Sequence, residues 1–200
     1  MLGVAWPSIS ASFGLPLGSM GILLLGFTVG YVVTTALIGT LIVRIGYGTV
    51  LNVSAVALAS GGAMWIVAPA WFFAIGAMTL LGTGAGLLDG GLNAYGATYM
   101  RPRDLNWLHA SYGIGASLGP AIMTPIVSSG GNWRFGYAFF TVFAFVVLGM
   151  FLRVRNQWIS ADSSTRPTVS DPTGSPTSTR SNSRSDVPTP RSQEPRGGRL

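Results

Sequence analysis

Residues 82–96 read GTGAGLLDGGLNAYG, and they place the acid Asp89 in a long apolar stretch with Asn93 one helical turn beyond it. Four residues share a sector of about 60° on a helix with about 100° per residue: Gly82, Gly86, Asp89 and Asn93. A carboxylate that faces lipid is energetically costly. We therefore expect this face to pack against another helix or to line a cavity, with Leu87 on the lipid-facing side.

Composition divides the chain into two parts. Only 9% of the 200 residues are charged, against about 25% in an average soluble protein, and the mean hydropathy is +0.48. Up to Trp158 there are two acidic residues; the segment after it is rich in Ser, Thr, Pro and Arg and has no aromatic residue. This pattern predicts a membrane-embedded helical bundle at 1–155 and a disordered tail at 156–200.

Apolar helical segments of about 20 residues can cross a bilayer core, and the chain contains five of them. The predicted spans are about 21–43, 49–69, 71–100, 107–127 and 135–152. Residues 1–6 are apolar but too few to cross before Pro7, so we interpret them as the last turns of a first helix that is cut short. The predicted fold class is an all-α polytopic membrane protein, packed through small residues spaced four apart, such as Gly26 and Gly30.

Arginine placement predicts the orientation of the chain. The connections at Arg44, at 101–103 and at 153–155 hold five arginines, whereas the alternate connections hold only Arg134. The positive-inside rule then places the first group and the C-terminal tail in the cytoplasm of a cell that carries the chain in its plasma or inner membrane. Four tryptophans near predicted span ends are expected to anchor at the membrane interface: Trp65, Trp71, Trp107 and Trp133.

Two interpretations of Asp89 are open from the residues alone. It can be a functional carboxyl on an ion or substrate path, as intramembrane acids often are. It can also be structural, bonding a neighbouring helix through Asn93 or Ser111. His109, near the interface, is a further candidate for a substrate or proton group.

Several classes of function are excluded by residue type. Cysteine is absent and His109 is the only histidine, so the sequence predicts no enzyme, no metal site and no cofactor. The arginines are dispersed between apolar segments, which argues against a nucleic-acid partner. The expected partners are the lipid bilayer, protons and a small solute.

Two sets of motifs resemble those of the major facilitator superfamily. Residues 39–48, GTLIVRIGYG, are similar to its Gly-x-Leu-x-Asp-Arg-x-Gly-Arg-Arg motif between the second and third helices; Gly39, Leu41, Arg44 and Gly46 match, whereas Val43, Tyr47 and Gly48 replace the acid and the later basic residues. Three further stretches resemble its fucose-permease-like branch: GTGAGLLDGGLNA (82–94), NWLHASYGIGASLGP (106–120) and WRFGYAFF (133–140).

The resemblance implies the N-terminal six-helix half of a major facilitator fold, without most of its first helix. It implies proton-coupled transport of a sugar or small polar solute, in which Asp89 exchanges the proton and Asn93 positions the acid or the solute. Other roles implied are a solute path along His109, Ser111 and Tyr112, and a cytoplasmic gate at Gly39, Arg44 and Gly46. The chain would self-associate or require a missing C-terminal half. The alternatives are an exporter of drugs or metabolites from the same superfamily, and a non-transporting membrane fragment or scaffold.

Overall fold

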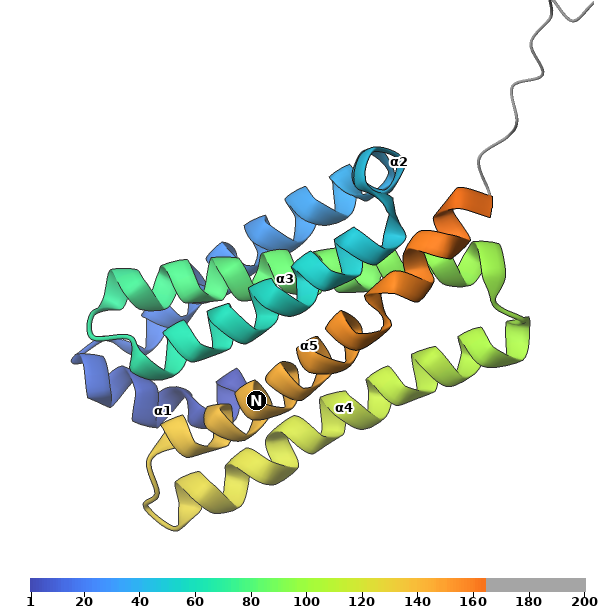
Figure 1. Ribbon diagram of the computed structural model, residues 1–200. Helices are drawn as coiled ribbons and strands as arrows, with labels where there is room; N and C mark the ends of the chain where they lie inside the picture. The colour runs from blue at the N-terminus through green and yellow to red at the C-terminus, as the bar shows by residue number, and fades with distance from the viewer. Residues whose placement is uncertain (165–200) are drawn as a thin grey trace, which may run out of the picture. The chain divides into compact units, whose positions relative to one another are not determined.

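The computed structural model describes the backbone of residues 1–164 and the side chains of residues 1–153, and this part of the chain is entirely helical. Its elements are α1 (Leu2–Phe13), the short 3-10 helix η1 (Leu17–Ser19), α2 (Met20–Val67), α3 (Trp71–Tyr99), α4 (Pro102–Ser128) and α5 (Trp133–Ser164) (Figure 1). Three of its stretches are long and apolar enough to cross a membrane: Leu17–Val67, Trp71–Tyr99 and Trp133–Arg153.

Helix α2 consists of two arms that meet at Gly46. This residue has φ 79° and ψ 159°, outside the helical region, so the helix axis changes direction there. Residues 20–45 form the first arm, which contains the predicted span 21–43. Residues 47–67 form the second arm, which ends two residues before the predicted span 49–69 does. Helix α4 covers the predicted span 107–127 but does not reach the hydropathy of the other three stretches, because glycine, serine, proline and histidine interrupt its apolar residues.

Helix boundaries differ from the prediction at three places. Helix α1 continues through Pro7, which lies inside it, to Phe13, and Gly14, with φ 64°, ends it. Helix α4 begins at Pro102, which is well suited to a first helical position. Helix α5 passes the predicted boundary at 155 and runs to Ser164, because no glycine or proline lies between 150 and 164. The predicted disorder of the rest of the tail concerns residues 165–200, which are outside the described residues.

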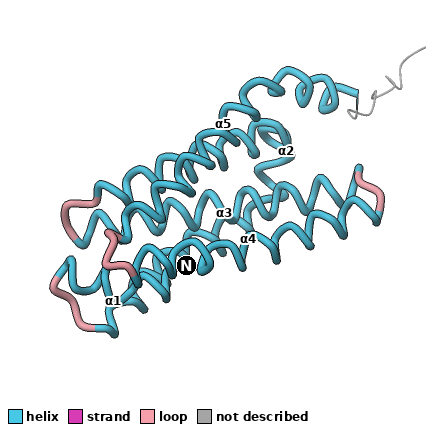
Figure 2. The backbone as a smooth tube through the Cα atoms, turned by 90° about the horizontal axis from the view of Figure 1, so that it is seen from below, coloured by secondary structure: helices cyan, strands magenta, loops and turns pink. Residues whose placement is uncertain are grey.

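Helix α3 lies between the two arms of α2. On one side, a Cβ atom on Gly30 would approach the backbone nitrogen of Thr83 to 2.9 Å. On the opposite side, a Cβ on Gly84 would come within 2.9 Å of Leu58 in the second arm. The expectation that Leu87 faces lipid is therefore wrong: its side chain is only 6% exposed, because the second arm covers that face of α3. Figure 2 shows the same helices from below.

The main apolar core lies where α1, α5 and the C-terminal part of α4 meet the ends of α2 and α3. It contains Trp6, Trp65, Met78, Met123 and Trp133. The rings of Trp65 and Trp133 are tilted against each other with centroids 5.7 Å apart, and neither is more than 2% exposed. These two tryptophans are therefore packing residues rather than interface anchors. Trp107, at 66% exposed, remains free to contact lipid.

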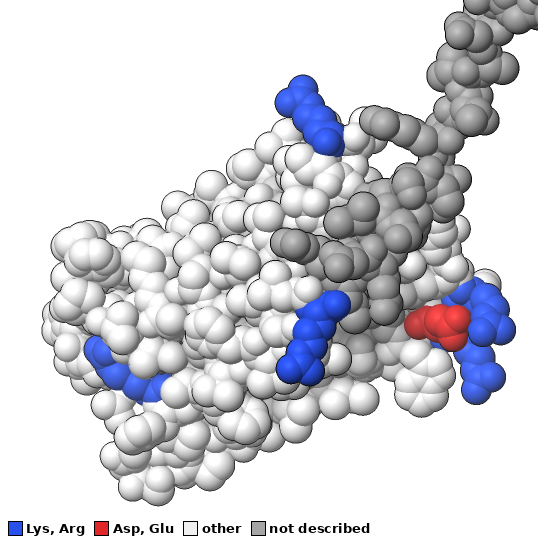
Figure 3. All heavy atoms as spheres, viewed as in Figure 1, with Lys and Arg blue, Asp and Glu red and all other residues white. Residues whose placement is uncertain are grey.

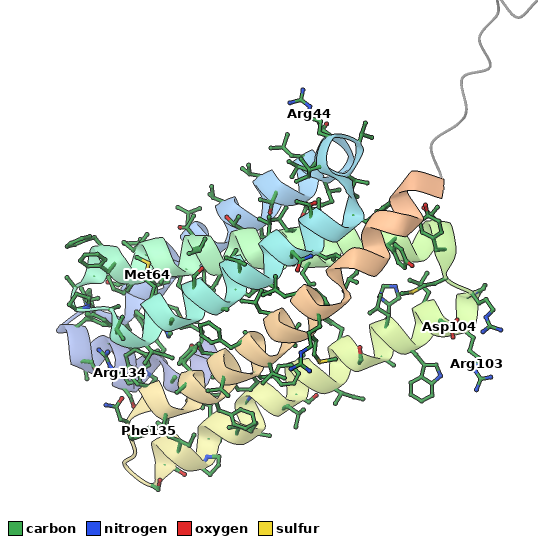
Figure 4. All side chains as sticks on the ribbon, viewed as in Figure 1. Arg44, Met64, Arg103, Asp104, Arg134 and Phe135 are labelled. Atoms are coloured by element: carbon green, nitrogen blue, oxygen red, sulfur yellow. The ribbon has the colours of Figure 1, made fainter. Side chains whose placement is uncertain are left out.

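Charged side chains are sparse on the described helices. The face of the molecule in Figure 3 is almost entirely uncharged, and its acidic atoms lie together with basic atoms at one end. There Arg101 and Asp104 form an exposed ion pair with 3.4 Å between Nε and Oδ2. At the other end of the helices, Arg134 donates hydrogen bonds to the carbonyls of Ile66 and Ala68, where α2 ends (Figure 4).

Candidate functional site

A seam of glycines joins the first arm of α2 to α3. A Cβ atom on Gly82 would overlap the backbone of Phe27, and one on Gly86 would collide with the carbonyl of Tyr31. Glycine is therefore required at these positions for the two backbones to approach this closely, as in other small-residue contacts between membrane helices. The seam fixes the distance and the register between the two helices.

Asp89 lies one turn beyond this seam and accepts two hydrogen bonds. The hydroxyl of Tyr31, in the first arm of α2, donates to its Oδ2 across a distance of 2.6 Å. The side-chain amide of Asn93 donates to its Oδ1 across 3.0 Å from the same helix. The polar face that we predicted on α3 is therefore turned toward the first arm of α2. We call Tyr31, Asp89 and Asn93 the carboxyl cluster.

The carboxyl cluster has no cation among the described side chains. The ion pair found within residues 1–153 is the exposed one between Arg101 and Asp104, and Asp89 is instead held by neutral donors. Each hydrogen bond to a charged group contributes about 1.5–3 kcal/mol. A partly buried carboxyl held by two neutral donors can take up a proton without breaking an ion pair. This chemistry suits proton exchange.

Three of the site residues that we predicted from the sequence lie on α4. The phenol of Tyr112 has a weak electrostatic influence on that of Tyr31, and the Tyr112 side chain is 78% exposed. Ser111 donates to the carbonyl of Leu108, in its own helix. His109 is exposed. Within the described residues, no hydrogen bond joins Tyr112, Ser111 or His109 to the carboxyl cluster.

The exposed part of α4 carries two shallow, open surface depressions rather than an enclosed cavity. One is lined by Ala110, Gly113, Ile114, Ser117, Leu118 and Ala121, and the other by Arg103, Asn106, Trp107 and Ala110. No group of three His, Cys, Asp or Glu side chains is placed to bind a metal ion in the part of the chain that the structure describes.

The residues of the predicted cytoplasmic gate lie at and before the bend in α2. Gly46 occupies the positive-φ position that separates the two arms. Arg44 is exposed and projects away from the helices (Figure 4). Gly39 has open space around it. Tyr47, at a motif position that is commonly basic, places its ring edge-on against Tyr95 and Tyr99 of α3, at centroid distances of 5.6 and 6.0 Å.

Tyr31 is a site residue that we did not predict from the sequence. It lies 58 positions before Asp89, so no local spacing connects the two. The available sequence signal was its position directly after Gly30, which forms with Gly26 a pair of glycines that favours contact between helices. That signal does not identify which helix makes the contact.

These features define an α-helical membrane protein with a polar carboxyl cluster between two of its apolar helices. The chain matches the model of the Major Facilitator Superfamily over residues 1–190 and therefore belongs to that superfamily. Its members are transporters rather than enzymes. No curated protein and no solved structure matches the chain.

Proposed function

We propose that the chain takes part in proton-coupled transport of a sugar or another small polar solute, and that Asp89 is the carboxyl that exchanges the proton. The observation that carries this proposal is the carboxyl cluster: an acid in an apolar helix, bonded to Tyr31 and Asn93 and to no cation among the described residues. Intramembrane acids of this kind commonly belong to proton or substrate paths. Membership of a transporter superfamily supports the same conclusion.

The proposal assigns a role to each part of the site. Asn93 positions the acid, and Tyr112 borders the solute path from α4, where His109 and Ser111 extend the path. Transporters of this superfamily hold the solute near the middle of the membrane between two repeats of helices that rock against each other. In this proposal, a second repeat of helices comes from a copy of this chain or from a C-terminal half.

Vesicle transport tests the proposal. The chain is reconstituted in lipid vesicles, and accumulation of a labelled monosaccharide is measured with and without a pH gradient. Asp89→Asn should abolish gradient-driven accumulation while part of the solute exchange remains, because the amide cannot release a proton. Asp104→Asn is the matched control, since Asp104 is an exposed surface acid, and it should accumulate solute as the unmodified chain does.

Each other outcome contradicts part of the proposal. Unchanged gradient-driven accumulation in Asp89→Asn would remove Asp89 from the coupling step. Accumulation in the opposite direction under the same gradient would indicate an exporter. No movement of solute by the unmodified chain, with correct insertion, would favour a non-transporting membrane scaffold.

A further inference from the structure

The hydroxyl of Tyr31 is the only group from another helix that bonds to Asp89 within the described residues. The two oxygens are 2.6 Å apart, a short distance typical of a hydrogen bond to an ionised acceptor. Asn93 lies one turn from Asp89 on the same helix, so its hydrogen bond to the acid does not link α3 to another helix. The bond from Tyr31 instead joins α2 to α3.

The position of the Tyr31 ring is fixed by its surroundings. Phe27, one turn earlier, stacks against it with centroids 6.3 Å apart and an interplanar angle of 14°. The glycine seam brings the backbone of Tyr31 against Gly86. The hydroxyl is therefore held at Asp89 by packing, in addition to its hydrogen bond.

No cation bonds to this pair within the described residues. The hydroxyl of Thr34 lies beside it but donates to backbone carbonyls. Tyr112 of α4 has only a weak electrostatic influence on the phenol of Tyr31. Within the described residues, the hydroxyl of Tyr31 and the amide of Asn93 are therefore the side-chain donors to the Asp89 carboxyl.

We infer that Tyr31 is a positioning residue for Asp89, which stabilises the ionised carboxylate and thereby sets the pH at which the acid takes up its proton. The inference rests on the proposed function for its meaning in transport. When a proton binds to Oδ2, a new O–H bond forms there and is donated to the phenol oxygen, while the hydroxyl of Tyr31 rotates away. The hydrogen bond from Tyr31 to Oδ2 is replaced by one from the protonated acid to Tyr31, and no other covalent bond forms or breaks. Proton uptake thus reverses the hydrogen bond that links α2 to α3.

Infrared spectroscopy of the chain in phosphatidylcholine vesicles tests the inference without requiring transport. The absorbance of protonated carboxyl groups is followed against pH, and the component lost in Asp89→Asn is assigned to Asp89. In Tyr31→Phe the midpoint of this component should move to higher pH by about 1 unit or more, because a hydrogen bond of about 1.5–3 kcal/mol to the charged form is removed and one unit corresponds to about 1.36 kcal/mol.

Tyr47→Phe is the matched control, because it removes a hydroxyl from the same helix at a tyrosine that packs against Tyr95 and Tyr99. Its midpoint should equal that of the unmodified chain. An equal midpoint in Tyr31→Phe would overturn the inference.

A second measurement uses the unmodified protein and does not depend on the folding of Tyr31→Phe. Ultraviolet resonance Raman spectra of tyrosine should change across the same pH range as the carboxyl component, and this change should be absent in Asp89→Asn. A tyrosine spectrum that stays constant across that range would overturn the inference. If Asp89→Asn abolishes coupled transport but the Tyr31 tests fail, only this inference is wrong. If the Tyr31 tests succeed and coupling survives in Asp89→Asn, the proposed function is wrong.

Discussion

At the scale of the residue, the chain uses glycine for two different physical purposes. Gly46 supplies a backbone conformation, with φ 79°, that L-residues rarely adopt. Gly82 and Gly86 are helical and supply space, since a Cβ atom at either position would overlap α2. The motif that contains Gly46 therefore has a conformational reason for its glycine, independent of any role in gating.

Replacement of Gly46 by alanine should lower the free energy of unfolding by about 1–3 kcal/mol, the usual cost of placing a side chain in a rare backbone region. Unfolding in mixed micelles of increasing denaturing-detergent content measures this change. Gly39→Ala is the control, because Gly39 is helical and has open space around it; it should not be destabilised. Equal stability of the two variants would show that the bend in α2 does not require a positive φ at residue 46.

At the scale of the element, α3 is the central helix, because both of its main faces are covered by the arms of α2. The first arm contacts it through backbone-to-backbone approach at glycines, and the second arm through larger side chains such as Leu51 and Leu58. The carboxyl cluster lies on the side of the first arm. Its geometry therefore depends on how closely that arm approaches.

Gly82→Ala should separate the first arm from α3 and destabilise the chain by about 1–3 kcal/mol, as overpacking commonly does. The same variant should weaken the bond between Tyr31 and Asp89, so the infrared component of Asp89 should titrate at higher pH. Gly113→Ala is the matched control, since a Cβ atom there meets nothing within 4 Å. A Gly82→Ala variant with the stability and titration of the control would contradict the role of the seam.

At the scale of the whole molecule, the described helices are packed unevenly. The tryptophan-rich core contains parts of α1 and α5, the ends of α2 and α3, and the C-terminal part of α4. Residues 111–118 of α4, in contrast, are all exposed. The positive-inside rule predicts a cytoplasmic side for Arg44, just before the bend in α2, and for the pair of Arg101 with Asp104 at the start of α4. The turn before α5 is expected on the other side.

The absence of cysteine from the sequence allows this orientation to be tested with single introduced thiols. Ser129→Cys, in the turn after α4, should react with a membrane-impermeant maleimide added outside intact cells. Thr98→Cys, near the end of α3, should react only after the membrane is opened. Both residues are exposed, so access to the thiol depends on the side of the membrane. The reverse pattern would invert the orientation.

The sequence by itself determined the elements that depend on local properties. Apolar length predicted the helices of α2, α3 and α5, and the period of the helix placed Asp89, Asn93 and the glycines on one face. It did not predict the burial of Leu87 or of Trp65, because burial depends on which helix covers a face. The predicted helix boundaries were wrong at Pro7 and beyond residue 155, where the local sequence signals for a helix end are weak.

Only the tertiary structure decided what the polar face of α3 touches. A helix fixes the direction of its side chains through its own hydrogen bonds, so that direction is encoded within a few residues. The partner of Asp89 is instead set by the approach of two backbones whose residues are 58 positions apart. That approach depends on the combined packing of glycines on both helices, and so Tyr31 could be assigned to the carboxyl cluster only once the helices were placed together.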